Sequence, residues 1–169
     1  YAAKDFDYLY MLFFKSSKYS FILLWFLCFP FFFVVDDILA IWLKQVPHYA
    51  SSFVFLILLY SLVNSLNQPI WTLAQAVGKL KGYICIGSAV FLMAFPISYI
   101  LLRQGFSPNA VFETNVVVRV FYLITVFVII RKYIPVSIYR YFKETLLPIF
   151  LVCIVSVVPV MALGVVISD

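Results

Sequence analysis

Charged side chains are scarce in this sequence. Asp, Glu, Lys and Arg together make up 11% of its 169 residues, whereas a soluble domain carries roughly a quarter. Hydrophobic residues account for 66%, and the mean hydropathy is +1.10. This composition excludes an ordinary soluble domain and predicts an integral membrane protein. The aromatic content of 20% fits lipid-facing helices and interfacial belts.

The groups that usually carry catalysis or bind metals are also few. The chain has one histidine, His48, and its three cysteines lie in apolar runs without a CxxC pair or a Cys/His cluster. We interpret these cysteines as small buried hydrophobic residues. No nucleophile motif and no phosphate-binding glycine loop occurs, and no basic stripe lies on a polar domain. We therefore expect no enzyme activity, no metal or other cofactor, and no nucleic-acid partner.

Long apolar runs make up most of the chain. A spanning helix needs about 20 mostly apolar residues, and five segments qualify, at about 19–43, 51–76, 83–102, 110–130 and 145–167. Their short connections predict an all-α, polytopic transmembrane helix bundle over residues 19–169. Residues 1–18 are expected to be the end of a preceding helix or a cytoplasmic segment. Because the chain begins without Met and stops directly after an apolar run, we expect it to be a piece of a longer protein.

The basic residues are divided unevenly between the two sides of this bundle. One side has nine: Lys4, Lys15, Lys18, Lys79, Lys81, Arg131, Lys132, Arg140 and Lys143. The other side has two, Lys44 and Arg103. Cytoplasmic loops carry the excess of Lys and Arg in membrane proteins. The distribution predicts a cytoplasmic N-terminus and an external C-terminus for this chain.

The second apolar segment carries a polar stripe. Its members are Tyr60, Asn64, Asn67, Gln68, Trp71 and Gln75. Steps of three and four residues put all of them on one face of a helix. Two interpretations remain open. The stripe could line a wet substrate path, or it could hold helices together by interhelical hydrogen bonds of roughly 0.6 kcal/mol each.

A single basic residue, Arg119, lies near the centre of the fourth segment. An arginine there costs about 2.5–3.5 kcal/mol on insertion scales, so it should face the bundle interior. Asn115 and Tyr122 share its helix face. The guanidinium matches phosphate geometry, which favours binding of a phosphate or diphosphate. The alternative is a buried ion pair with a carboxylate such as Glu113, or with one on a helix outside this chain.

Two adjacent carboxylates, Asp36 and Asp37, lie toward the outer end of the first segment. One of them could line a cavity and couple transport to a cation. A solvated outer helix end is the favoured interpretation of both residues. His48, in the loop that follows, is interpreted as an ordinary loop residue.

Three strings in the sequence indicate a family. Ile38–Ala50 reads ILAIWLKQVPHYA, Ala74–Tyr83 reads AQAVGKLKGY, and Pro96–Leu102 reads PISYILL. They resemble runs in the polysaccharide flippases of the multidrug/oligosaccharidyl-lipid/polysaccharide exporter superfamily, the group of the O-antigen and capsule flippases. The resemblance covers about Lys15 to Arg131. One departure is Lys44, where the family often has glycine.

The resemblance implies a larger transporter of two pseudo-symmetric helix bundles, of which this chain would be most of the C-terminal half. It implies export of an undecaprenyl-diphosphate-linked oligosaccharide across the bacterial inner membrane by alternating access. The partners implied are membrane lipid and the remaining helices of the full-length protein. No site residue is transferred from the family, because none of its cavity-lining charges is fixed by a motif found here.

Other functions fit parts of the same pattern. A drug/cation antiporter of the same fold needs an acidic cavity, for which only Asp36, Asp37 and Glu113 are available in a basic chain. A membrane-embedded transferase needs a histidine or an aspartate pair near an interface, and His48 alone gives little support. A structural membrane subunit would use the polar stripe only to hold helices together.

Overall fold

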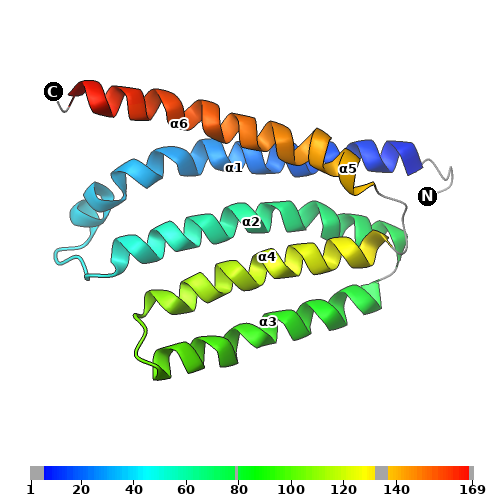
Figure 1. Cartoon of the computed structure of the whole chain (residues 1–169), viewed down its shortest axis with the longest axis horizontal. Coiled ribbons are helices and arrows are strands. Elements are labelled where there is room, and N and C mark those ends of the chain that lie inside the picture. Colours follow the sequence, from blue (N-terminus) through cyan, green and yellow to red (C-terminus); the bar gives the residue numbers. More distant parts are fainter. Residues whose placement is uncertain (1–5, 79, 132–136, 168–169) are drawn as a thin grey trace.

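The chain forms a bundle of long helices. The computed structural model describes residues 6–78, 80–131 and 137–167 (Figure 1). In these residues all regular structure is helical, and five helices are long and apolar enough to cross a membrane. The elements are α1 Phe6–Trp42, α2 Ala50–Val77, α3 Leu80–Arg103, α4 Asn109–Arg131, α5 Ile138–Tyr141, a π-helical turn Phe142–Leu146, and α6 Leu147–Ile167. A helix pairs its backbone N–H and C=O groups internally, and lipid offers these groups no hydrogen-bond partners. The predicted all-α fold with five spanning helices is confirmed.

The first helix is longer than the apolar run that predicts it. We expected a helix from about Tyr19, with residues 1–18 as a separate segment, but α1 already begins at Phe6. No helix breaker separates the two parts, and the hydroxyl of Ser16 donates to the carbonyl of Leu12 at 2.6 Å within the helix. At 1.5 Å per residue α1 is about 55 Å long. It is therefore much longer than the roughly 30 Å of hydrocarbon that it would cross.

The last helix also begins earlier than its apolar run, which starts at about Thr145. Ser137 caps α5 by accepting a hydrogen bond from the backbone N–H of Arg140 at 3.4 Å. The helix then passes through the π-helical turn into α6 without a break. Thr145, inside this turn, is completely buried, and its hydroxyl donates to the carbonyl of Phe14 in α1 at 3.5 Å. The turn thus places a polar contact between the two helices.

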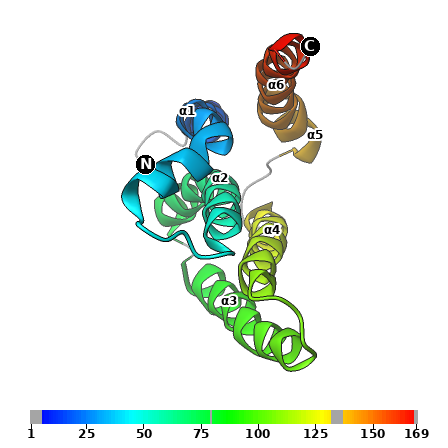
Figure 2. The same cartoon turned by 90° about the vertical axis from the view of Figure 1, so that its left-hand side faces the viewer.

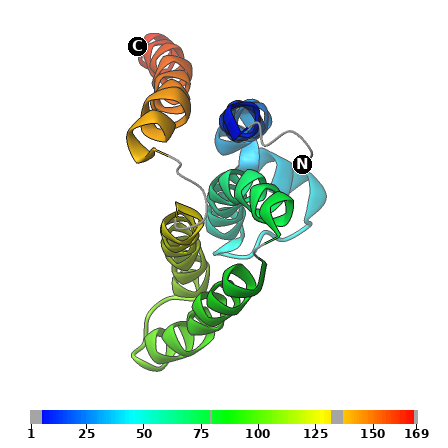
Figure 3. The same cartoon turned by 90° about the vertical axis from the view of Figure 1, so that its right-hand side faces the viewer.

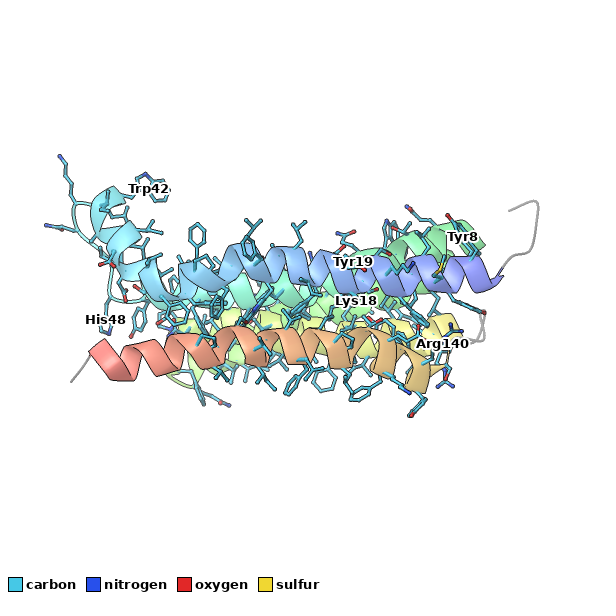
Figure 4. All side chains as sticks on the ribbon, turned by 90° about the horizontal axis from the view of Figure 1, so that it is seen from above. Tyr8, Lys18, Tyr19, Trp42, His48 and Arg140 are labelled. Carbon is cyan, nitrogen blue, oxygen red and sulfur yellow. The ribbon has the colours of Figure 1, made fainter. Side chains whose placement is uncertain are left out.

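Successive long helices run in opposite directions, which gives the bundle two ends. Figure 4 shows Tyr8 and Arg140 at one end and Trp42 and His48 at the other. At the turn after α2, Gly78 has φ of 73°. At the turn after α3, Gly105 has φ of 88°, a left-handed conformation that suits glycine. The N–H groups of residues 105 and 106 bond back to the carbonyls of residues 102 and 101 and end α3 tightly.

The order of helices in space differs from their order in sequence. Viewed end-on, α6 lies near α1, α1 lies on α2, and α4 lies between α2 and α3 (Figures 2 and 3). The contacts of α4 with both α2 and α3 are extensive, whereas α2 and α3 touch each other only slightly. A groove therefore remains between α2 and α3, with α4 as its floor.

The buried hydrophobic core lies at the end of the bundle where α1 begins and where α2 and α4 end. Its members are Tyr10, Phe13, Phe14, Ile70, Leu73, Ala74, Val126, Ile130 and Tyr141. The ring of Tyr141 from α5 stacks on that of Phe13, with centroids 5.4 Å apart. Aromatic packing of this kind adds to area burial. The core thus attaches the last helix to the first.

A polar contact joins the same two helices nearer the middle of α1. The indole Nε1–H of Trp25 in α1 donates to the hydroxyl oxygen of Ser156 in α6 at 2.9 Å. The Ser156 hydroxyl in turn donates to the carbonyl of Val152 one turn earlier at 2.8 Å. Both polar groups are therefore satisfied within an otherwise apolar pair of helices.

Candidate functional site

A cavity of about 410 Å³ lies in the groove between α2 and α3, with α4 behind it. The polar stripe of α2 and the central arginine of α4 both contribute to its wall. The residues that line it are Asn64, Asn67, Gln68, Trp71, Ile84, Gly87, Ser88, Phe91, Arg119 and Tyr122. Its volume is in the range of small-molecule sites in proteins. Within the described residues, polar side chains from three membrane-length helices, α2, α3 and α4, converge at this cavity.

Arg119 is held in the cavity wall by neutral groups. Its guanidinium donates a hydrogen bond to the Oδ1 of Asn64 in α2. The carbon Cζ lies 5.0 Å from the ring centroid of Tyr122 and 5.4 Å from that of Tyr60, which are cation–π distances. Its Nε is buried and has no hydrogen-bond acceptor. The positive charge therefore has favourable contacts but no carboxylate partner among the described residues.

Glu113, the carboxylate that we considered as an ion-pair partner for Arg119, does not contact it. Glu113 lies nearly two turns earlier on α4 and is exposed. Residues six positions apart point in different directions on a helix. An ion pair between these two side chains is therefore not formed in the described structure.

Asn67 is the most deeply buried polar residue of the cavity wall, with 3% of its surface exposed. Its Nδ2 donates to the carbonyl of Val63 at 3.5 Å, which is long for a hydrogen bond. Its Oδ1 has no donor. Trp71, one turn further along α2, lines the cavity and also packs against the hydrophobic core.

The remaining stripe residues lie around this cavity in different ways. Gln68 lines it and also a second cavity of about 430 Å³ between α1 and α2. Tyr60 lies beside Arg119 without lining the cavity. Gln75 is exposed, one turn beyond Trp71 toward the end of α2. Asn115 is occupied by its own helix, since its Nδ2 donates to the carbonyl of Val111 at 2.8 Å.

The structure thus brings together six of the nine candidate pathway residues at one cavity, namely Asn64, Asn67, Gln68, Trp71, Arg119 and Tyr122. A seventh, Tyr60, stacks over the arginine. Gln75 and Asn115 are on the predicted helices but do not line the cavity.

The acidic pair of α1 lies elsewhere. Asp36 and Asp37 are both exposed, and the hydroxyl of Ser51 at the start of α2 donates to the carboxylate of Asp36. Ser51 is 13 residues before Asn64 on α2, or about 20 Å along the helix axis. The weak candidates for ion coupling are therefore not part of this cavity.

The loop that holds His48 is also remote from the cavity. The imidazole packs edge-on against the ring of Tyr49 with centroids 4.9 Å apart, at the end of the bundle shown in Figure 4. Within the described ranges no group of three or more His, Cys, Asp or Glu side chains is placed to hold a metal ion.

The wall formed by α3 was not predicted from the sequence. Gly87 is its key residue, because a Cβ there would lie 2.7 Å from Cε2 of Tyr122. The missing side chain lets the tyrosine ring lie against α3 and under the cavity. The only signal in the sequence is the pair of small residues Gly87 and Ser88 within an apolar run. Small residues permit close helix contacts in membranes.

A comparison of the chain with protein families, with curated proteins and with solved structures gives no match.

Proposed function

We propose that this chain is part of a membrane transporter that exports a lipid-linked oligosaccharide precursor across the bacterial inner membrane by alternating access. The observation that carries the proposal is the cavity between α2, α3 and α4, where Arg119 lies among neutral amides and has no carboxylate partner among the described residues. The resemblance of the three sequence strings to polysaccharide flippases supports the same function.

The charge of the cavity fits an anionic cargo. The guanidinium of Arg119 does not deprotonate in proteins, so its positive charge is permanent. Asn64, Tyr60 and Tyr122 stabilise this charge but do not neutralise it. A diphosphate that crosses the apolar part of a membrane needs a counter-charge on its way. Arg119 supplies one and can bind two phosphate oxygens at once.

The other functions receive less support from the cavity. A cation-coupled drug antiporter needs a carboxylate in its cavity, and none is among the described residues that line this one. A transferase that uses His48 would have to act at an exposed loop. If the polar side chains served only to hold helices together, their groups would be paired, but the Nε of Arg119 and the Oδ1 of Asn67 have no partner in the described part of the chain.

The proposal is tested by replacing Arg119 in the full-length protein and measuring surface polysaccharide together with the amount of protein in the membrane. We expect Arg119→Ala to abolish export at normal protein abundance. Arg119→Lys should retain part of the activity, since it keeps the charge but loses the bidentate geometry. Arg103→Ala, which removes an exposed arginine at the end of α3, is the matched control and should export normally.

Two results would contradict the anion-binding role of Arg119. Normal export at normal abundance in Arg119→Ala would show that the charge is not needed. A loss of protein in Arg119→Ala that a neutralised carboxylate elsewhere in the full-length chain restores would show a structural ion pair.

A further inference from the structure

Two buried atoms of the residues that line the cavity have opposite needs. Among the described residues, the Nε of Arg119 is a donor without an acceptor, and the Oδ1 of Asn67 is an acceptor without a donor. Burying either group without a partner costs free energy. The Asn67 side chain is almost completely buried and belongs to the cavity wall. A ligand that matches this cavity must therefore offer an acceptor to one residue and a donor to the other.

A phosphate or diphosphate alone cannot meet both needs. An ionised phosphate oxygen accepts hydrogen bonds and has none to give, so it suits Arg119 but not the Asn67 oxygen. The orientation of the Asn67 amide follows from its contact with Val63, because a backbone carbonyl accepts only from the Nδ2 side. The group that meets Asn67 must carry an O–H or N–H of its own.

From this complementarity we infer that the cavity has two subsites, one for the anion at Arg119 and one for a neutral group that bears hydroxyl or amide N–H at Asn67 and Trp71. The inference rests on the proposed function and specifies its substrate. In a lipid diphosphate that carries sugars, the neutral group is the first sugar ring. Asn67 and Gln68 offer amides to its hydroxyls, and the indole of Trp71 offers an apolar face to its C–H groups.

The spacing along α2 agrees with this assignment. Asn64, which bonds Arg119, is three residues before Asn67 and seven before Trp71. These steps correspond to about 4.5 Å and about 10.5 Å along the helix axis. The neutral subsite therefore begins one turn from the anion and extends over a further turn, toward the end of the bundle where α2 ends. A monosaccharide attached directly to a phosphate spans a similar distance.

Access to the Asn67 oxygen needs only a local change. The bond from Nδ2 to Val63 is 3.5 Å long and so holds the amide weakly. A rotation of the side chain toward the cavity exchanges this weak contact for a hydrogen bond to the ligand. Asn67 is thus a specificity residue: it distinguishes a sugar-bearing lipid from the bare lipid diphosphate.

The test compares two probes on the full-length protein in lipid nanodiscs, polyprenyl diphosphate and the same lipid diphosphate with one N-acetylhexosamine. We expect the sugar-bearing probe to bind about tenfold more tightly, as one hydrogen bond to a buried group can provide. In Asn67→Ala the preference for the sugar-bearing probe should fall several-fold, because the hydrogen bond to Asn67 is lost while Gln68 and Trp71 remain, and the affinity for the bare probe should be unchanged. That unchanged affinity also shows that the variant is folded. Asn115→Ala is the matched control, since its amide bonds its own helix, and it should keep the tenfold preference.

Each alternative gives a different pattern. Equal binding of both probes by the unmodified protein would overturn the sugar subsite and leave the proposed function intact. A preference that is undiminished in Asn67→Ala would show that only water meets the Asn67 oxygen, and an equal loss for both probes would show a structural role; either result overturns the inference. Failure of the unmodified protein to bind either probe would instead overturn the proposed function, and the inference with it.

Discussion

At the scale of single residues, the contacts of Arg119 are about strong enough to offset the cost of placing it in a membrane helix. That cost is about 2.5–3.5 kcal/mol on insertion scales. A hydrogen bond that involves a charged group contributes roughly 1.5–3 kcal/mol, and each cation–π contact about 0.5–2 kcal/mol. Asn64, Tyr60 and Tyr122 supply one bond and two ring contacts. Neutral partners can thus hold the arginine without cancelling the charge that a ligand would use.

The contact between Gly87 and Tyr122 leads to a prediction. In Gly87→Ala the new Cβ would lie 2.7 Å from Cε2 of the Tyr122 ring, so the ring, which forms part of the cavity wall, must shift. We expect a loss of stability of about 1–3 kcal/mol, typical of overpacking, and reduced export, both measured on the full-length protein. The double variant Gly87→Ala/Tyr122→Leu should be no less stable than Tyr122→Leu alone, because the shorter side chain frees the space that the new Cβ needs.

Ser88→Ala is the control for this prediction, since it lines the same cavity but removes an atom instead of adding one. It should leave stability nearly unchanged. If Gly87→Ala is as stable as the unmodified protein and exports normally, the close approach of the ring to α3 does not shape the cavity.

Residue periodicity explains which part of the site could be predicted. The stripe on α2 follows from steps of three and four, and Arg119 is conspicuous because charge is rare in the apolar run. The contribution of α3 has no such signal, because Ile84 and Phe91 are apolar like their neighbours and Gly87 acts through an absent side chain. Nor does spacing reveal that the Asn115 amide is occupied by its own backbone.

At the scale of elements, hydropathy identifies where a chain meets lipid and does not mark where a helix begins. Five apolar runs predict the five long helices correctly. However, α1 begins 13 residues before the expected Tyr19, and the last helical stretch begins at Ile138, seven residues before Thr145. Both extensions carry polar or charged residues. These residues lower the hydropathy of the two stretches but do not prevent a helix from forming. The π-helical turn between α5 and α6 also leaves no trace in an apolar pattern.

The pair of α1 and α6 gives a prediction at this scale. Trp25→Phe keeps the aromatic ring but removes the donor to Ser156. We expect it to lower the free energy of unfolding in detergent by about 0.6–1.7 kcal/mol, as interhelical hydrogen bonds in membrane proteins typically contribute. Trp42→Phe, at a position that is 81% exposed, is the control and should have almost no effect. Equal effects of the two substitutions would mean that the Trp25 bond does not stabilise the pair.

At the scale of the whole molecule, the alternating helices collect the basic residues at the two ends. At one end, Arg131 ends α4 and Arg140 lies in α5; at the other end, Lys44 follows α1 and Arg103 ends α3. We therefore expect the end with Tyr8 and Arg140 in Figure 4 to face the cytoplasm.

Cysteine labelling in intact cells tests this orientation. In a background without Cys28, Cys85 and Cys153, a cysteine at His48 should react with an impermeant thiol reagent, whereas one at Lys81 should react only after the cells are opened. His48 is exposed in its loop, so access is not limited by packing. The reverse pattern would show that the bundle has the opposite orientation in the membrane.

The weak contact between α2 and α3 has a consequence for biogenesis. Helices enter the membrane in the order of synthesis, so α3 is made when α2, its immediate predecessor, offers it little surface for packing. The next helix, α4, packs extensively on both of them. We therefore expect α3 and α4 to leave the insertion machinery together, as a hairpin that docks on α2 through α4. When this hairpin docks on α2, α4 forms the floor of the groove that holds the cavity.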